Sequence, residues 1–470
     1  MHMWHETRLK LPQVTQVASA IGLSLIFTLY LAPSKYFTAD LLAAVLLVIA
    51  LGAFGLRRSG VMGGIKPLAP LLVMLLYAGV FGLSVGAVPD AVPYMSELLI
   101  GFVPFLLLYV VFRNQAPAQV PILTIAVFLV PGLVHLAFMY LDVFMAVQHG
   151  DMPFLSSSKQ GWLEYIKEAP RVGRRYLSLA LLHLLCVGLL MAWHFRRAPA
   201  RYWAWGLASL SVLSLALLDA RAAYASVIIG GALLVMAVGP RRAWQALKSL
   251  LPTGPGGRLL LVSLLVAAAG VGYSAGKSRW VAMNDSFAAA VHDVFYSEVE
   301  LAQRPFVNES YWSEPIEDID ACYMEGHFRC KIDQSAYLRM AWMLSGMRSL
   351  LEHPLGIGYS DDYMARIWGV AGEQGRYQRS DSFLVEHIVS FGLPGIMLYA
   401  LLVWSLLRSL RYAVRSCNAP ILLVAVCGII LVCVGRGLVD VLTEGFWRYL
   451  MALLGMYYGL LHSKEWRTIK

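Results

Sequence analysis

Long apolar windows, separated by short polar segments, run through most of the chain. A window of roughly 18 or more apolar residues can cross the hydrocarbon core of a membrane as a helix. The pattern therefore predicts an all-α polytopic membrane protein with about 12 transmembrane helices. The predicted spans are 14–32, 39–56, 68–88, 95–112, 119–146, 176–195, 202–219, 222–238, 259–276, 383–407, 419–438 and 441–461.

The spacing of these windows divides the chain into three parts. Residues 1–276 hold the first nine predicted helices, and residues 383–470 hold the last three with a polar tail. Between them lies 277–382, a long loop of the kind that is commonly functional. Within it, 334–352 carries an apolar stripe at helical spacing, which predicts an amphipathic helix lying against the bilayer.

The composition excludes a soluble enzyme. Hydrophobic residues make up 59% of the chain and charged residues 14%, whereas soluble domains have about 25% charged residues. This chain has too little charge to cover the surface of a soluble protein of its length, so a membrane protein is the consistent interpretation.

The basic residues indicate how the chain is oriented. Lys and Arg gather in alternate short loops, including 57–66, 196–201, 241–258 and 408–415, whereas the opposite loop at 33–38 carries only Lys35. By the positive-inside rule, both termini are cytoplasmic. Residues 147–175 and 277–382 then lie outside, in the periplasm of a Gram-negative cell. The net charge of +9 thus reflects orientation in the membrane and gives no reason to expect nucleic acid as a partner.

Several arginines fall at the predicted outer face, beside membrane spans. Arg171, Arg174 and Arg175 precede one span, Arg221 opens another, and Arg339 lies in the predicted amphipathic helix. A guanidinium stays charged and binds phosphate in a bidentate manner, so these residues suit a lipid diphosphate. The alternative is that these side chains snorkel to the membrane interface. For Arg221, which directly adjoins a predicted span, we prefer the functional interpretation.

Acid and base candidates cluster in 352–364 and 376–395. His353-Pro354 should end the amphipathic helix, and Gly356 should allow a tight turn after it. Asp381 stands at the mouth of the tenth span, where it is either a partly buried base or the N-cap of that helix. The full set of candidates is Asp361, Asp362, Asp381, Glu386, His387 and His353.

Two further groups have mainly structural interpretations. Cys322 and Cys330 both fall in the oxidising outer compartment and are candidates for a disulfide. His327 lies between them, but the sequence offers too few further ligands for zinc, so no metal site is expected. Arg436, Asp440, Glu444 and Arg448 recur every four residues, and we interpret this series as an internal packing network rather than a site.

Three segments together resemble one family. LLDARAAYAS at 217–226, SAYLRMAW with LLEHPLGIGY within 335–359, and SDSFLVEHIVSFGLPG at 380–395 resemble the O-antigen ligase and O-antigen polymerase superfamily of bacterial inner-membrane lipopolysaccharide glycosyltransferases. The resemblance implies transfer of a glycan from undecaprenyl diphosphate to an acceptor sugar hydroxyl, without a metal or other cofactor. The acceptor is lipid A–core for ligases and a second lipid-linked repeat for polymerases.

The resemblance also assigns residues. Arg221 matches the first family arginine, Arg339 matches the arginine of the SAYLR helix, and Arg174 or Arg175 falls where another basic residue is expected. These would bind the donor pyrophosphate. Where many ligases have a histidine run, this chain has Arg379-Ser380-Asp381-Ser382. Either Asp381 replaces that base, or His387 or His353 supplies it, or this chain has altered chemistry. The Asp-Ser pair favours the polymerases, whereas the SAYLR and HPLGIGY segments favour the ligases.

Two other function classes fit parts of the pattern. A secondary transporter can also have 12 spans with both ends inside, but such carriers often divide into two similar halves. Here the longest loop is external and follows the ninth span, so the halves do not match. A non-catalytic scaffold of envelope assembly is supported only by the missing histidine.

Overall fold

The computed structural model describes residues 69–84, 102–113, 125–148, 174–194, 198–217, 221–250, 282–313, 332–380, 382–416, 421–439 and 444–463, with single positions between 258 and 270. Over these residues the chain is mostly helical and contains no strand; one isolated bridge pairs Asn308 with Arg376. The prediction of an all-α protein is confirmed for this part of the chain.

The helices before the long loop follow the predicted apolar windows closely, except the last of them, which falls in the charged loop predicted at 241–258. They are α4 (Ala69–Ser84), a helix at 102–113, the π-helical turn η4 (Ile125–Leu129) with α7 (Val130–Gln148), α9 (Arg174–His194), α10 (Ala198–Leu217), α11 (Arg221–Val238) and α12 (Pro240–Leu250). The predicted spans 14–32 and 39–56 lie outside the described residues, and only scattered positions of 259–276 are described.

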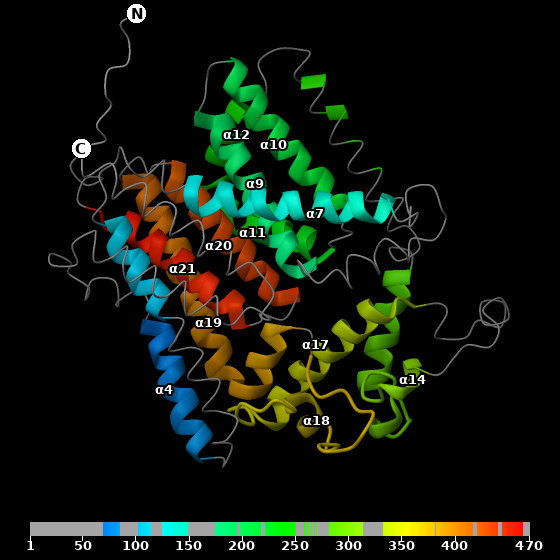
Figure 1. Ribbon diagram of the computed structural model, residues 1–470. Coiled ribbons are helices and arrows are strands. Elements are labelled where there is room, and N and C mark those ends of the chain that lie inside the picture. The colour runs from blue at the N-terminus through cyan, green and yellow to red at the C-terminus, as the bar shows by residue number, and fades with distance from the viewer. Residues whose placement is uncertain are drawn as a thin grey trace, which may run out of the picture.

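The last three helices form the centre of a bundle. They are α19 (Phe383–Ser416), α20 (Ile421–Val439) and α21 (Glu444–Leu461). In Figure 1, α20 lies among α9, α11, α19 and α21, and it packs against each of them. Their facing side chains make one large hydrophobic core, in which Tyr109, Tyr449 and Tyr457 are fully buried.

Apolar side chains also cover much of the outside of this bundle. In α19, Leu393, Met397, Leu401 and Trp404 are exposed along one face, while Leu402 and Leu406 are buried on the other. Among the described residues, α19 is the one helix long and apolar enough to cross a membrane, over Phe383–Arg415; the other apolar stretches are shorter. Twelve spans therefore remain a prediction.

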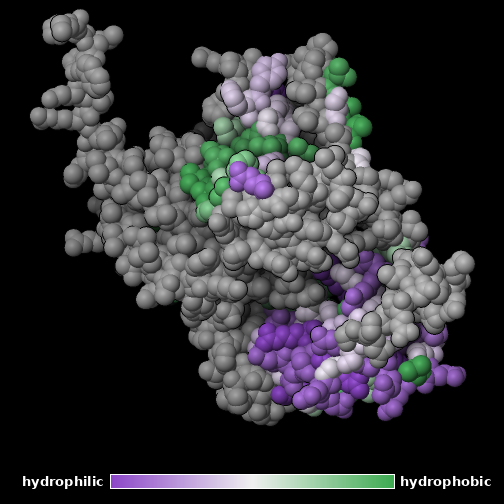
Figure 2. All heavy atoms as spheres, turned by 45° about the vertical axis from the view of Figure 1, so that its right-hand side comes forward, coloured by the Kyte–Doolittle hydropathy of each residue, from purple (hydrophilic) through white to green (hydrophobic). Residues whose placement is uncertain are grey.

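The long loop before α19 has a hydrophobic core of its own. A helix at 282–295, η5 (Leu301–Gln303), α14 (Ser310–Ser313), α17 (Gln334–Glu352) and α18 (Tyr363–Ile367) surround it. Buried Phe306, Tyr337, Trp342 and Trp368 fill this second core. We call 282–313 together with 332–380 the outer segment. It lies in the lower right part of the molecule in Figure 1, to the right of α4, and Figure 2 shows hydrophilic residues gathered there.

The amphipathic helix predicted at 334–352 is α17, with the same limits. Asp333 caps its start by accepting a hydrogen bond from the Ala336 amide at 2.9 Å. Its apolar stripe packs inward, against α19 and the second core. The sequence pattern predicted that this stripe faces the bilayer; instead, the face left outside carries only a few apolar side chains, such as Met347 and Leu351.

Candidate functional site

The two motifs at 352–359 and 380–395 are joined through their backbones. α19 is broken at Gly392, whose φ of 58° and ψ of −148° are accessible essentially to glycine alone. The turn after α17 docks into this break, and Gly356, with φ of 87°, lies against the Ser390 carbonyl. Three hydrogen bonds join the segments: Ile357 N–H to Val389 O at 3.0 Å, Gly358 N–H to Ser390 O at 3.0 Å, and Leu393 N–H to Pro354 O at 2.9 Å.

Neither glycine tolerates a side chain at this junction. A Cβ on Gly392 would collide with the backbone of Pro354 and Leu355, and one on Gly356 would collide with the Ser390 carbonyl. From α4, the Tyr77 hydroxyl donates to the Leu355 carbonyl at 2.7 Å, which fastens the same turn from a third element. The expected end of the helix at His353 and the turn after it are confirmed, but the docking into α19 was not predicted.

The segment that leads into α19 is held on both sides. The Ser380 amide donates to the Tyr363 hydroxyl at 2.9 Å, and the two hydroxyls hydrogen-bond at 2.7 Å. Tyr363 is almost fully buried, and burial raises the pKa of its phenol. On the far side, the Ser382 hydroxyl donates to the Leu438 carbonyl at 3.2 Å. Ser380 and Ser382, the neighbours of Asp381, are thereby fixed between α18 and α20.

Two of the candidate acids near this segment are held by arginines. Asp361 pairs with Arg379, and Asp362 pairs with Arg366. Although partial burial by itself raises the pKa of Asp362, hydrogen bonds from Ser360 and Arg366 and the Arg366 charge bring that pKa below its ordinary value. A carboxylate held ionised in this way is poorly suited to deliver a proton.

The three candidate bases have different environments. Asp381 lies outside the described residues. His353 is exposed at the C-terminal end of α17. His387 is 1% exposed in α19, between Phe383 and Phe391. Its Nδ1 lies 3.0 Å from the Phe383 carbonyl oxygen, which can only accept, so Nδ1 carries a proton and donates it.

Among the predicted phosphate-binding arginines, Arg339 is the one whose side chain is described. It lies half-buried on α17, and its Nε is buried without a hydrogen-bond partner. Arg174 and Arg221 are the first residues of α9 and α11, and Arg175 follows Arg174. The side chains of these three arginines, together with Cys322 and Cys330, lie outside the described part of the chain.

The predicted series at 436–448 contributes two deeply buried arginines. Arg436 and Arg448 are each 5% exposed, and Arg436 donates to the Ser178 hydroxyl of α9 at 3.2 Å. Between α21 and α9, the Tyr449 hydroxyl lies 3.4 Å from His183 Nδ1. The Asp440 and Glu444 side chains lie outside the described residues, so the interpretation of the series as a packing network stays a prediction.

Sequence reasoning did not find Tyr363, whose hydroxyl positions Ser380. The available signal was the Ser-Asp-Ser run itself, because two hydroxyl residues at a helix start need partners when they are buried.

No family model matches the sequence, and no curated protein matches it.

Proposed function

We propose that the chain is a polytopic inner-membrane glycosyltransferase that moves a glycan from undecaprenyl diphosphate to an acceptor sugar hydroxyl, with lipid A–core as the acceptor. The observation that carries the proposal is Arg339. A half-buried guanidinium whose Nε makes no hydrogen bond is costly unless an anion completes it. A diphosphate supplies oxygens in the geometry that a guanidinium binds best.

The junction around Gly392 supports the same proposal. Two segments that carry the family resemblance, LLEHPLGIGY and SDSFLVEHIVSFGLPG, are separated in sequence yet share backbone hydrogen bonds. α17, which bears Arg339, packs against α19. The segments that carry the resemblance therefore contact each other in the fold, as the parts of one site should.

The exposed apolar faces support the membrane assignment. Large apolar side chains stand outside on several helices besides α19, with Leu76 of α4, Phe144 of α7 and Trp203 of α10 among them. Exposed apolar surface on this scale marks contact with lipid or another protein. We propose 12 spans with cytoplasmic termini and the site on the periplasmic face.

The proposed reaction is an inverting displacement at the anomeric carbon. The acceptor hydroxyl forms the new bond to this carbon as the bond to the diphosphate oxygen breaks, and the electron pair leaves with undecaprenyl diphosphate. Arg339, with Arg221 and Arg174 or Arg175, stabilises the charge that develops on the leaving group. The acceptor proton passes to a base. The burial of His387 among aromatic rings favours Asp381 over it for this role.

The test is Arg339→Ala in the full-length protein, with purified undecaprenyl-diphosphate-linked glycan and lipid A–core as substrates. We expect transfer to fall at least about 100-fold, the loss typical of removing one group that stabilises developing charge. Arg339→Lys should keep part of the activity. Arg366→Ala is the control, because Arg366 is already paired with Asp362 and should leave transfer unchanged. Full activity in Arg339→Ala would remove the basis of the proposal.

A polymerase is the second candidate, favoured by the Asp381-Ser382 pair in place of a histidine run. The lipopolysaccharide of a deletion strain separates the two. Loss of all long chains with accumulation of lipid-linked polymer indicates a ligase, whereas a core carrying a single repeat indicates a polymerase. A transporter, the more distant alternative, would move substrate in proteoliposomes and show no transfer.

A further inference from the structure

One exposed face of α19 changes along the helix from apolar to basic. The exposed residues on it are, in order, Leu393, Met397, Leu401, Trp404, Arg408, Arg411, Tyr412 and Arg415. Apart from the adjacent Arg411 and Tyr412, they follow one another at three or four residues, so they share one side of the helix. Apolar side chains followed by an aromatic residue and then by arginines match the order of environments from the inside of a bilayer to its surface.

A second basic helix, α12, lies beside the end of this face. Gly239, with φ of 93°, ends α11 and turns the chain into α12. Nη1 of Arg242 on α12 donates to the Val414 carbonyl of α19 at 2.8 Å, directly before Arg415. We call the exposed cations of the two helices together the basic surface. They are Arg241, Arg242 and Lys248 of α12 with Arg408, Arg411 and Arg415 of α19.

No acidic residue of these helices balances the basic surface. Asp and Glu are absent from the sequence over 220–284, which includes α12, and over 387–439, which includes the basic end of α19. Within the described part of the chain, none of the six cations forms an ion pair. Cations gathered without acids create a positive potential, which concentrates anions from outside the chain at this surface.

The basic surface lies at the far end of α19 from the outer segment. The outer segment docks at the Gly392 break, and α19 continues from there to Ser416. At about 1.5 Å per residue, this part of the helix is long enough to cross a hydrocarbon core of about 30 Å. In Figure 1, α12 lies in the upper part of the molecule, whereas α17 and α18 lie in the lower part. The basic surface therefore suits the membrane face opposite the proposed site.

The residues beside the cations favour a lipid over a soluble anion. Trp404 and Trp244 are 61% and 57% exposed, and tryptophan is enriched at the depth of lipid headgroups. The Lys248 ammonium lies 5.5 Å from the centre of the Trp244 ring, so charge and indole are presented together on α12. On α19 the exposed apolar side chains continue directly into the arginines. A phospholipid can contact both parts of this face, whereas a soluble anion would contact only the cations.

We propose that the basic surface binds an anionic phospholipid of the inner leaflet. Its phosphate is held by the cations of α19 and α12, because guanidinium groups stay charged and bind phosphate oxygens in pairs. Its acyl chains lie along Leu401 and Met397. The bound lipid adds to the contact that Arg242 makes between the two helices. The inference rests on the membrane assignment within the proposed function, and it is independent of glycan transfer.

The test measures thermal unfolding of the full-length protein in a neutral detergent, with phosphatidylglycerol or phosphatidylcholine added. We expect phosphatidylglycerol, which is anionic, to raise the unfolding midpoint in a saturable manner, and phosphatidylcholine, which has no net charge, to leave it unchanged. Arg411→Gln should raise the phosphatidylglycerol concentration needed for half of the effect about fivefold, and Arg411→Gln combined with Arg415→Gln about 25-fold. Both side chains are exposed, so the fold should tolerate these changes.

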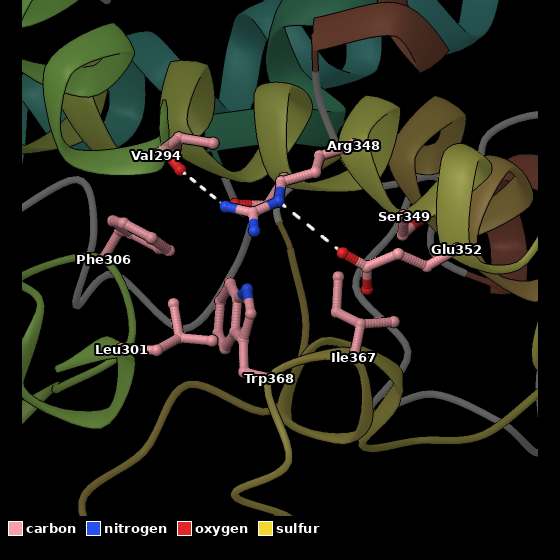
Figure 3. Close-up of a pocket in the computed structure, with 9 residues that line it drawn as sticks. Val294, Leu301, Phe306, Arg348, Ser349, Glu352, Ile367 and Trp368 are labelled. Carbon is pink, nitrogen blue, oxygen red and sulfur yellow. Dashed lines mark hydrogen bonds and ion pairs between the residues drawn. The ribbon is translucent and has the colours of Figure 1, made fainter. Parts of the chain in front are cut away.

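Arg348→Gln is the matched control, because Arg348 is an arginine of the outer segment whose side chain is 48% exposed. Figure 3 shows it donating to the Val294 carbonyl, at the other end of α19 from the basic surface. This variant should respond to phosphatidylglycerol as the unchanged protein does. Arg411→Lys, which keeps the charge, should retain most of the response. Inorganic phosphate at the same concentrations should not raise the midpoint; an equal rise would make this a phosphate site and overturn the inference.

The outcomes separate this inference from the proposed reaction. Equal responses to the two lipids, or an unchanged response in the double variant, would overturn the inference and leave glycan transfer untouched. A response to phosphatidylglycerol alone, in a protein without transferase activity, would remove the proposed reaction and leave the lipid site standing. A protein that stays monomeric without detergent would overturn the membrane assignment on which both proposals rest.

Discussion

Tyr363 illustrates how much of this site depends on a single hydroxyl. It accepts from the Ser380 amide and hydrogen-bonds to the Ser380 side chain, and both residues are buried. Sequence inspection identified Arg339 and Asp381 because charged residues next to apolar windows stand out. It passed over Tyr363, since an aromatic residue in an apolar setting is usually a packing residue and its partner lies on a different element.

We expect Tyr363→Phe to lower the free energy of unfolding by about 1–3 kcal/mol, because the buried Ser380 amide loses its partner. Hydrogen exchange at Ser380 and Ser382 should accelerate before global unfolding. Tyr296→Phe is the control, because Tyr296 is 72% exposed, and it should leave both quantities unchanged. Unaltered exchange in Tyr363→Phe would show that Ser380 is held by other contacts.

At the scale of elements, helices were predictable and their junctions were not. The limits of α17 follow from periodicity, the Asp333 cap and the His353-Pro354 end. The break at Gly392 inside α19 could not be predicted in this way, because the apolar pattern continues across it and only Gly392 and Pro394 mark the position. Backbone hydrogen bonds carry no side-chain signature, so the docking of 354–358 into this break could not be read from the pattern.

The junction predicts that an alanine substitution costs more stability at Gly392 than at Gly369. Gly392→Ala should destabilise the protein by about 3 kcal/mol or more, because strained backbone and a collision with Pro354 combine. Gly369 also has a positive φ, of 70°, but open space around it, so Gly369→Ala should cost only about 1–2 kcal/mol. Thermal unfolding in detergent measures both. Similar losses for the two variants would mean that the close backbone approach contributes little.

For the whole molecule, the charge pattern makes a prediction that the fold by itself does not. α12 carries exposed Arg241, Arg242 and Lys248 and is expected in the cytoplasm, whereas the outer segment is expected outside. The sequence indicated these two compartments from loop charges. It did not indicate that the outer segment builds its own core, because that core joins residues from 290 to 389 that show no common periodicity.

Cysteine labelling tests this orientation. In a background without the six native cysteines, Glu373→Cys should react with a membrane-impermeant maleimide in cells with a permeable outer membrane. Lys248→Cys should react only after the inner membrane is opened. Both side chains are exposed, so accessibility within the protein does not bias the comparison. Labelling in the reverse order would invert the topology and place the proposed site in the cytoplasm.

The division of α19 between the two cores bears on how the protein is made. Val385 and Val389 belong to the outer core, while Phe383 and Phe391 belong to the bundle core. Chains emerge from the ribosome N-terminus first, at about 5–20 residues per second, so the outer segment is synthesised before α19 exists. Its core lacks the Val385 and Val389 side chains until α19 has been synthesised and inserted. In the proposed orientation, the outer segment therefore stays incompletely folded outside the inner membrane until α19 is inserted and completes both cores together.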